Sequence, residues 1–390
     1  MHTRFRPSAS VLCAAALAAV LGAGVSPAIA SPPGNIFAPH STPAWEVHRL
    51  SLFVLGITGL IFVGVSSLLV YALFKFRGRA DDNTEPPQVF GSVQIELSWT
   101  IIPILIIVVL FLTTARVLFS VQDAPEPRNA LEVTVIGHQF WWEFRYPQYG
   151  IVTANELHVP LSGQPHPRPT YMKLISADVM HSFWVPELAG KTDVLPNRVN
   201  EMWIDPLKPG MYIGQCAQFC GPQHAKMLLR VYVDTPEQFK AWVANQQRVQ
   251  KELSPAQFTP VSVPNSGNRN AGSRIPPNSP PTRGGVSTQF LQASANDAIT
   301  PQNGQRVFEQ ESCISCHTIR GTIANGRYGP DLTHLMSRET LGAGAAANTP
   351  GDLLQWITDP NTYKPGCLMP AMHLTDRQNQ QITAYLLTLK

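Results

Sequence analysis

Two long apolar stretches of the chain contain no charged side chain. The first covers residues 50–74, which is 25 positions, and the second covers residues 97–115, which is 19 positions. A helix needs roughly 20 mostly apolar residues to cross the hydrocarbon core of a bilayer. The pattern therefore predicts a transmembrane helical hairpin within residues 31–125, with spans at about 50–74 and 97–119.

A shorter apolar run, residues 11–25, follows two arginines near the N-terminus. It is followed by Ala28-Ile-Ala30, which has the small residues of a cleavage site. These features predict a secretory signal peptide over residues 1–30, cleaved after Ala30. An uncleaved anchor is the alternative, but the apolar run is short for a membrane span.

Basic residues give the hairpin its expected orientation. Lys75, Arg77 and Arg79 follow the first apolar stretch directly. Lysine and arginine accumulate in cytoplasmic loops, so this loop is expected in the cytoplasm. A cleaved signal would leave Ser31 outside, which agrees. We therefore expect a multi-pass protein of the bacterial plasma (inner) membrane, in contact with lipid, whose remaining residues lie on the periplasmic side.

Residues from about 130 to 233 alternate between apolar and polar in short runs, at 131–136, 171–175 and 228–233. Proline and glycine separate these runs, which is typical of an antiparallel β-sandwich. We place this all-β domain at residues 128–245. Thr235 and Pro236 are the expected N-cap and first residue of a helix that follows the last strand.

Composition indicates several modules in the 390 residues. Charged residues make up 14% of the chain, against about 25% in soluble domains, and there are 35 prolines. Residues 246–290 are rich in Pro, Ser, Asn and Gly without apolar periodicity, which predicts a linker before a separate domain at residues 291–390. Whether that domain is mobile or docked stays open. The net charge of +3, without a basic aromatic cluster, gives no reason to expect a nucleic-acid partner.

One loop concentrates ligands for a soft metal. Residues 215–227 contain Cys216, Cys220, His224 and Met227. Thiolate, imidazole and thioether together select copper or zinc, and a weak methionine ligand suits copper. A one-copper electron-transfer site needs a single cysteine, so the second thiol suggests two bridged coppers. A disulfide between the cysteines is the alternative in an exported protein, but it would leave the histidine and methionine unexplained.

The last domain contains Cys313-Ile-Ser-Cys316-His317, the attachment signature of a c-type haem. Met369 is the candidate sixth ligand, with Met336 and Met372 as rivals. A structural zinc site would need a further ligand pair, which His334 and Cys367 fit poorly. Cys367 receives no role. A closing helix is expected after Thr375, with Ile382, Tyr385 and Leu386 on one face.

The metal loop and one upstream histidine resemble the dinuclear copper centre, CuA, of subunit II of the haem-copper respiratory oxidases. The resemblance implies a cupredoxin-like sandwich, and the Met-Pro sequence at residue 369 resembles class I cytochromes c. It also implies that the two cysteines bridge both coppers, that one histidine binds each copper, and that a methionine and a backbone carbonyl complete the two sites. The implied ligands are His181, Cys216, Gln218 through its carbonyl, Cys220, His224 and Met227.

Three further features follow from the same resemblance. Gln218 stands where the family has a glutamate whose carboxylate helps to hold magnesium, a charge that glutamine cannot supply, so the magnesium site stays open. Glu96 resembles an acid near a proton-uptake pathway, although a solvated charge at a helix end is the equal alternative. Phe140 occupies the position of the family's electron-accepting tryptophan. Trp141 and Trp142 are possible substitutes, with aromatic core packing as the alternative for all three.

The resemblance implies the electron-input subunit of a cytochrome c oxidase. Electrons would pass from the haem c to CuA and on to haem in subunit I, where oxygen is reduced to water with proton translocation. This chain has no oxygen-reducing site of its own, because its spans carry no histidine. Expected partners are subunits I and III and a donor such as a cytochrome c or a quinol-cytochrome c reductase. A nitric oxide reductase relative and a stand-alone membrane-anchored electron carrier are the alternatives. The donor, the haem type of subunit I and the final acceptor stay open.

Overall fold

The computed structural model describes residues 34–77, 85, 88, 90–122, 129–163, 167–249 and 298–390. The predicted signal peptide at residues 1–30 and nearly all of the predicted linker at residues 246–290 lie outside these ranges.

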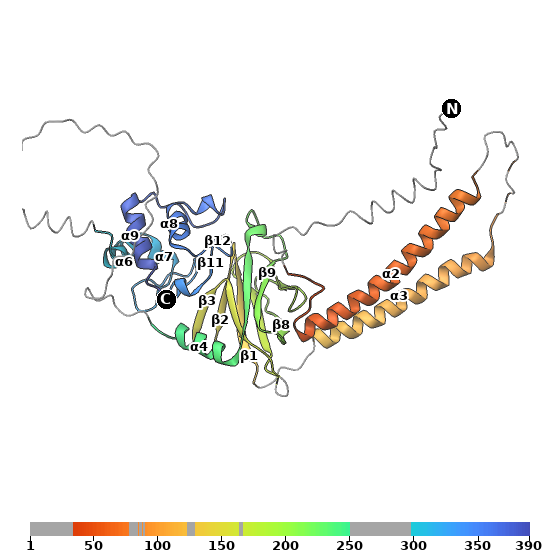
Figure 1. The fold of residues 1–390 in the computed structure, drawn as a ribbon, viewed down its shortest axis with the longest axis horizontal. Coiled ribbons are helices and arrows are strands. Elements are labelled where there is room, and N and C mark those ends of the chain that lie inside the picture. The colour runs from red at the N-terminus through yellow and green to blue at the C-terminus, as the bar shows by residue number, and fades with distance from the viewer. Residues whose placement is uncertain are drawn as a thin grey trace, which may run out of the picture. The chain divides into compact units, whose positions relative to one another are not determined.

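Two long apolar helices form a hairpin. Helix α2 covers Thr42–Lys75 and helix α3 covers Val93–Gln122, and they lie side by side in Figure 1. Both are long and apolar enough to cross a membrane, as predicted, and both extend beyond the charge-free stretches. Their side chains are largely exposed within the chain, as expected of surfaces that face lipid.

Polar contacts tie the start of α2 and the end of α3 to the β-domain. The hydroxyl of Thr42 donates to Oδ2 of Asp205 at 2.6 Å, and the backbone N–H of Asp205 donates to the hydroxyl of Ser41 at 2.9 Å. The indole N–H of Trp203 donates to the carbonyl of Val121 at 2.7 Å. The helical hairpin is therefore fixed to the sandwich at the end formed by the start of α2 and the end of α3.

The β-domain consists of two five-stranded sheets, which confirms the predicted sandwich (Figure 1). The first sheet has the order β3 (Ile151–Ala154), β2 (Trp141–Tyr146), β1 (Leu131–His138), β5 (Thr170–Ser176) and β8 (Asn200–Ile204). The second has the order β4 (Glu156–Pro160), β10 (Leu228–Asp234), β9 (Gly210–Cys216), β6 (His181–Trp184) and β7 (Thr192–Val194).

Most strand pairs of the sandwich are antiparallel, as the alternation predicts, but two pairs are parallel. Strand β1 pairs in parallel with β5, with Val133 opposite Met172, and β4 pairs in parallel with β10, with Leu157 opposite Val231. Each pair joins strands that are distant in sequence, so no tight hairpin forces them to run in opposite directions. Local alternation reports which face of a strand is buried and carries no information about the direction of a remote neighbour.

The core lies between the sheets. Val135 and Phe144, which are opposite each other in the β1–β2 register, are fully buried, as is Phe183 from the other sheet. Helix α4 (Pro236–Gln246) begins with Thr235 as its N-cap, as predicted. Gln238 completes a capping box, because its side chain accepts from the backbone N–H of Thr235 while its own N–H donates to the threonine hydroxyl.

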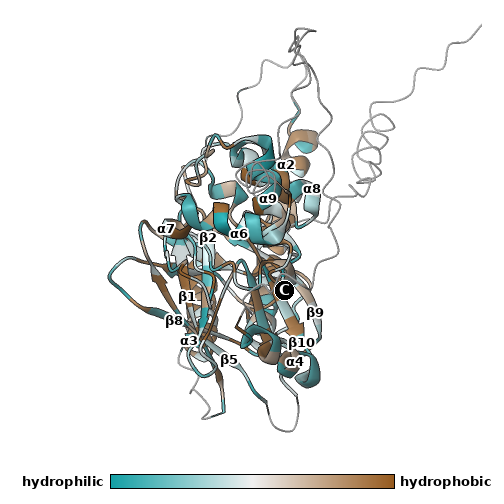
Figure 2. Ribbon diagram, turned by 90° about the vertical axis from the view of Figure 1, so that its left-hand side faces the viewer, coloured by the Kyte–Doolittle hydropathy of each residue, from teal (hydrophilic) through white to brown (hydrophobic). Residues whose placement is uncertain are grey.

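The C-terminal region is helical around a separate core. Helices α6 (Pro301–Gln310) and α9 (Asp376–Leu386) each carry hydrophilic and hydrophobic residues, as expected of helices that bury one face (Figure 2). They cross closely at Gly304, where an added Cβ would lie 1.9 Å from the carbonyl oxygen of Gln381. Helix α9 begins directly after Thr375, as predicted, and the structure shows that the threonine side chain caps it by accepting from the backbone N–H of Gln378. Between these helices the chain forms α7 (Cys313–Cys316), η2 (Leu335–Ser337), β11 (Thr340–Leu341), β12 (Ala346–Ala347), α8 (Pro350–Thr358) and η3 (Pro360–Thr362).

Candidate metal and haem sites

The second sheet brings the predicted soft-metal ligands together. Cys216 ends β9, the loop to β10 contains Cys220 and the short helix η1 (His224–Lys226), and Met227 directly precedes β10. His181 begins β6, which pairs with β9 so that Phe183 lies opposite Cys216. Sheet pairing therefore places a histidine 35 residues upstream beside the cysteines.

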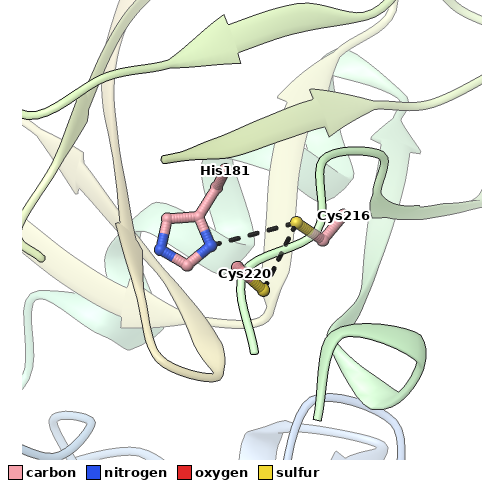
Figure 3. Close-up of side chains that lie close together, drawn as sticks. All are labelled: His181, Cys216 and Cys220. Atoms are coloured by element: carbon pink, nitrogen blue, oxygen red, sulfur yellow. Dashed lines mark hydrogen bonds between the residues drawn. The ribbon is translucent and has the colours of Figure 1, made fainter. Parts of the chain in front are cut away.

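Figure 3 shows the imidazole of His181 facing the two thiols. Its Nδ1 atom lies 3.9 Å from Sγ of Cys216, and this sulfur lies 3.8 Å from Sγ of Cys220. All three side chains are buried. A disulfide has a sulfur–sulfur distance of about 2.05 Å, so the two thiols are free in this arrangement.

Three further donors surround the thiols. Sγ of Cys220 lies 3.7 Å from Nδ1 of His224 and 3.9 Å from Sδ of Met227. Sγ of Cys216 lies 3.2 Å from the carbonyl oxygen of Gln218. Metal–sulfur bonds of about 2.3 Å in a tetrahedral site give ligand separations of about 3.8 Å. The donor set therefore fits metal ions placed between these atoms.

The pKa values of the two thiols shift in opposite directions. The interaction with Cys220 lowers the pKa of the Cys216 thiol, assisted by His181, and the same interaction raises the pKa of Cys220. Burial lowers the pKa of His181, but its hydrogen bonds with Asp178 and Cys216 outweigh burial and raise the pKa overall. Cys216 thus favours the thiolate, which is the form that binds a metal.

Asp178 orients His181, and our sequence analysis did not identify it. Its Oδ1 lies 2.8 Å from Nε2 of His181, and its Oδ2 accepts from the backbone N–H of Gln139 at 2.6 Å. A carboxylate on the far nitrogen of a ligating histidine sets the tautomer and the ring orientation. The sequence signal for this role is an acidic residue three positions before the histidine. The ring also fits closely against Gly137, where an added Cβ would lie 2.8 Å from Cδ2 of His181.

The three aromatic candidates lie in different environments. Phe140 is buried, with its ring against Gly221, whose φ of 132° favours glycine. Trp142 is fully buried in the core, with its ring centroid 5.9 Å from that of His181. Trp141 is half-buried and stacks on His138 at 4.2 Å. None of the three presents a fully exposed ring.

The haem-attachment signature forms a compact turn. Cys313 and Cys316 begin and end α7, and the Nδ1–H of His317 donates to the carbonyl of Pro330 at 2.8 Å. This bond leaves Nε2 as the nitrogen with a free lone pair. Burial lowers the pKa of His317, which favours the neutral, ligating form. The imidazole lies against Gly329, where an added Cβ would lie 2.5 Å from Cε1.

Arg338 provides a further test of whether a haem fits. The guanidinium is buried, lies close enough to His317 to lower the pKa of that imidazole, and donates from Nη2 to the carbonyl of Asp331. Its Nε–H has no hydrogen-bond partner among the described residues. A buried guanidinium with a free N–H beside the attachment site suits a carboxylate such as a haem propionate.

Among the methionine candidates, Met369, Met336 and Met372 are all half-buried, so the choice of Met369 stays a prediction. The ring nitrogens of His334 lie 2.7 Å from the carbonyl of Lys390 and 3.0 Å from that of Arg248, which disfavours a zinc ligand there. Cys367 donates to the carbonyl of Met369 at 3.4 Å.

Glu96 lies in the first turn of α3, with an exposed side chain. Its backbone carbonyl accepts from the hydroxyl of Thr100 at 2.8 Å. Its suggested role in proton uptake stays a prediction.

Comparison with known proteins identifies three segments. Family models match for the transmembrane domain of cytochrome c oxidase subunit II at residues 30–117, for its periplasmic domain at residues 163–233, and for cytochrome c at residues 301–390. Cytochrome c oxidase subunit 2 of Alkalihalophilus pseudofirmus is 31% identical over 344 residues, which cover 86% of each chain. The subunit 2 of Bacillus sp. strain PS3 is 31% identical over 331 residues, 80% of this chain and 79% of the relative. The crystal structure of the periplasmic domain of subunit II of cytochrome oxidase of Bradyrhizobium japonicum is 28% identical, covers 31% of this chain and 96% of that one, and has a TM-score of 0.29.

Proposed function

This chain belongs to the cytochrome c oxidase subunit II family and carries a fused cytochrome c domain, and we propose that it is the electron-input subunit of a respiratory oxidase. It is a membrane protein with an extracytoplasmic domain and works with other subunits of an oxidoreductase complex. In the proposal, a covalently attached haem c in residues 291–390 and a dinuclear copper centre in residues 128–245 each carry one electron at a time.

The observation that carries the copper proposal is the convergence of three side chains and one carbonyl on two buried sulfurs. Cys216 and Cys220 would bridge both coppers, and His181 and His224 would bind one each. Met227 and the carbonyl of Gln218 would complete the two sites. The side chain of Gln218 brings no charge, so a magnesium ion at this position would need other carboxylates.

Residues around the loop position these donors. The β6–β9 pairing and the Asp178 carboxylate hold His181, while Gln139 donates from Nε2 to the carbonyl of Cys220 at 2.7 Å. Prior positioning of the ligands leaves little to rearrange when the charge of the site changes, which suits electron transfer.

For the haem, Cys313 and Cys316 would supply the two thioether bonds, His317 one axial ligand and Met369 the other. Electrons would leave for haem in subunit I, where oxygen is reduced to water with proton translocation. Subunit III and a donor such as a cytochrome c or a quinol-cytochrome c reductase complete the proposed set of partners.

The test is electron paramagnetic resonance of the intact purified complex. We expect the many-line hyperfine pattern of one electron shared by two copper nuclei, and we expect His224→Ala to abolish it. His373→Ala, which changes an exposed histidine of the C-terminal region, is the matched control and should leave it intact. A single-copper pattern, or zinc in place of copper, would refute the dinuclear site.

Two measurements separate the oxidase from its alternatives. A stand-alone carrier would purify without a large haem-containing membrane subunit, whereas an oxidase subunit would purify with one. Oxygen uptake by that complex, compared with nitric oxide consumption, separates the oxidase from a nitric oxide reductase relative.

A further inference from the structure

The β11–β12 hairpin of the C-terminal region contacts the second sheet of the sandwich through Glu156 of β4. Its carboxylate is 2% exposed. It accepts from the backbone N–H of Glu339 at 2.9 Å, from the backbone N–H of Thr340 at 3.0 Å and from the hydroxyl of Thr340 at 3.1 Å. Three donors from one domain thus satisfy a buried anion of the other.

Neighbouring bonds extend this contact along β10. The backbone N–H of Leu228 donates to the carbonyl of Ala343 at 3.2 Å, and Nη1 of Arg230 donates to the hydroxyl of Thr340 at 2.7 Å. Leu228 directly follows the proposed copper ligand Met227, so the hairpin lies beside the metal loop.

A second contact comes from the segment that leads to the candidate haem ligand Met369. Lys364 is 3% exposed, and its ammonium donates to the carbonyl of Phe140 at 2.7 Å and to that of Gly342 at 3.0 Å. Lys226, within η1 of the metal loop, donates to the carbonyl of Tyr363 at 2.8 Å. A buried cation of the C-terminal region therefore bonds to the backbone of Phe140, one of the three candidates for electron entry.

Phe140 leads directly to the copper loop. Its ring packs on Gly221, and the adjacent Gln139 donates to the carbonyl of Cys220 at 2.7 Å. Lys364 is close enough to both Cys220 and Cys367 for its charge to interact with each thiol. This places Lys364 between the loop proposed to hold copper and the loop proposed to hold the haem methionine.

We propose that Glu156 and Lys364, here called the docking pair, hold the C-terminal region on the sandwich in a single arrangement beside Phe140 and the metal loop, so that copper receives electrons from the chain's own haem and not from a free carrier. Docking itself requires only the described contacts, whereas the consequence for electron flow rests on the proposed function. The C-terminal region bonds to the carbonyl of Phe140 and to the backbone N–H of Leu228, so a separate protein would have to displace it to dock at this place.

The charges of Glu156 and Lys364 favour one relative orientation of the two domains. A buried charge is tolerated only where hydrogen bonds replace its lost hydration. A docking that buried Glu156 or Lys364 without these partners would cost more than burying an apolar side chain, and one that left them in water would lose these hydrogen bonds. Two charges of opposite sign, one on each domain, thus select one orientation out of the many that apolar contact would allow.

Hydrogen exchange in the intact complex tests the docking without reference to either metal. We expect Glu156→Gln and Lys364→Met each to raise exchange at residues 339–346 at least tenfold. Glu132→Gln and Lys173→Met, which alter an exposed ion pair on the other sheet, are the controls and should change nothing. Thr340→Val, which removes one donor without leaving a buried charge unpaired, should give a smaller increase and guards against variants that fail to fold. Unchanged exchange in Glu156→Gln and Lys364→Met would overturn the docking pair.

Rapid reduction of the same complex by a soluble cytochrome tests the consequence. In the unaltered complex, the haem absorption should change first and the near-infrared absorption of copper should follow at a rate independent of donor concentration. In the double variant Glu156→Gln/Lys364→Met, copper reduction should slow at least tenfold and become dependent on donor concentration and salt. Direct copper reduction in the unaltered complex, at the rate of the haem, would overturn the exclusion of a free carrier. Absence of haem or copper would instead refute the proposed function, and the exchange result would still decide the docking.

Discussion

The carboxylate of Asp178 lies 2.8 Å from Nε2 of His181, while the other ring nitrogen of that histidine faces the thiol of Cys216. The same carboxylate accepts from the backbone N–H of Gln139. One acid thus joins His181, a proposed copper ligand, to the segment that supports Cys220. The histidine cannot turn without breaking a charge-assisted hydrogen bond.

We expect Asp178→Asn to weaken copper binding by about 10- to 100-fold, the usual effect of losing a partner that orients a metal ligand. The measurement is the loss of copper from the intact complex to a competing chelator, monitored through the copper hyperfine signal. Asp193→Asn, an exposed acid in β7, is the control and should behave as the unaltered chain. Equal copper retention in the two variants would show that the sheet alone orients His181.

Gly304→Ala should destabilise the C-terminal region by roughly 3 kcal/mol, because the new Cβ would meet a backbone oxygen that cannot move away without separating α6 from α9. The measurement is the thermal midpoint of the haem absorption band. Gly351→Ala in α8 is the control, since its Cβ would have no atom within 4 Å. That variant should be neutral or slightly stabilising. Equal midpoints in the two variants would contradict the close helix crossing.

The haem ligands give a third prediction. Cys316→Ala should lose one thioether bond and weaken haem attachment. Met369→Ala should keep the haem but lower its reduction potential, because thioether ligation favours ferrous iron. Spectra and potentiometry of the intact complex measure both changes. If Met372→Ala removes the sulfur-to-iron absorption band and Met369→Ala does not, the axial assignment belongs to Met372.

Lys364 predicts how docking depends on pH. Burial lowers the pKa of its ammonium to about 8, from 10.5, despite the attraction of Cys367 and Cys220. The exposed lysine of the separated domains keeps its proton up to about pH 10.5. The separated state therefore binds more protons between these two pH values, and docking is favoured increasingly as pH rises from about 8, by roughly 3 kcal/mol in total.

The measurement is the urea concentration at which half of the molecules have separated domains. Energy transfer between a dye on each domain monitors this separation. We expect the midpoint of the unaltered chain to rise between pH 8 and pH 10 relative to that of Lys364→Met. Other groups titrate in this range, and the difference between the two chains removes their contribution. A constant difference across this range would show that Lys364 keeps its proton when docked.

Many features of this protein depend only on residues that are close together in the sequence. The two charge-free apolar stretches predict membrane helices because a charged side chain within a bilayer is costly, whatever the helices pack against. Thr235 predicts a helix start because a cap bonds only to N–H groups within the next turn. Cys313, Cys316 and His317 predict haem attachment because the chemistry needs those three groups within a single turn. The identities of the proposed copper ligands in residues 215–227 follow from the sequence for the same reason.

Tertiary structure decided whatever depends on residues that are distant in the chain. The parallel pairing of β1 with β5 and of β4 with β10 follows from how the sheets close, and alternation within a strand is the same for either direction. Glu156 and Lys364 look like ordinary surface charges in the sequence. Only folding brings Glu156 to an N–H group 183 residues away and Lys364 to a carbonyl 224 residues away, where the loss of water makes each charge depend on its partners.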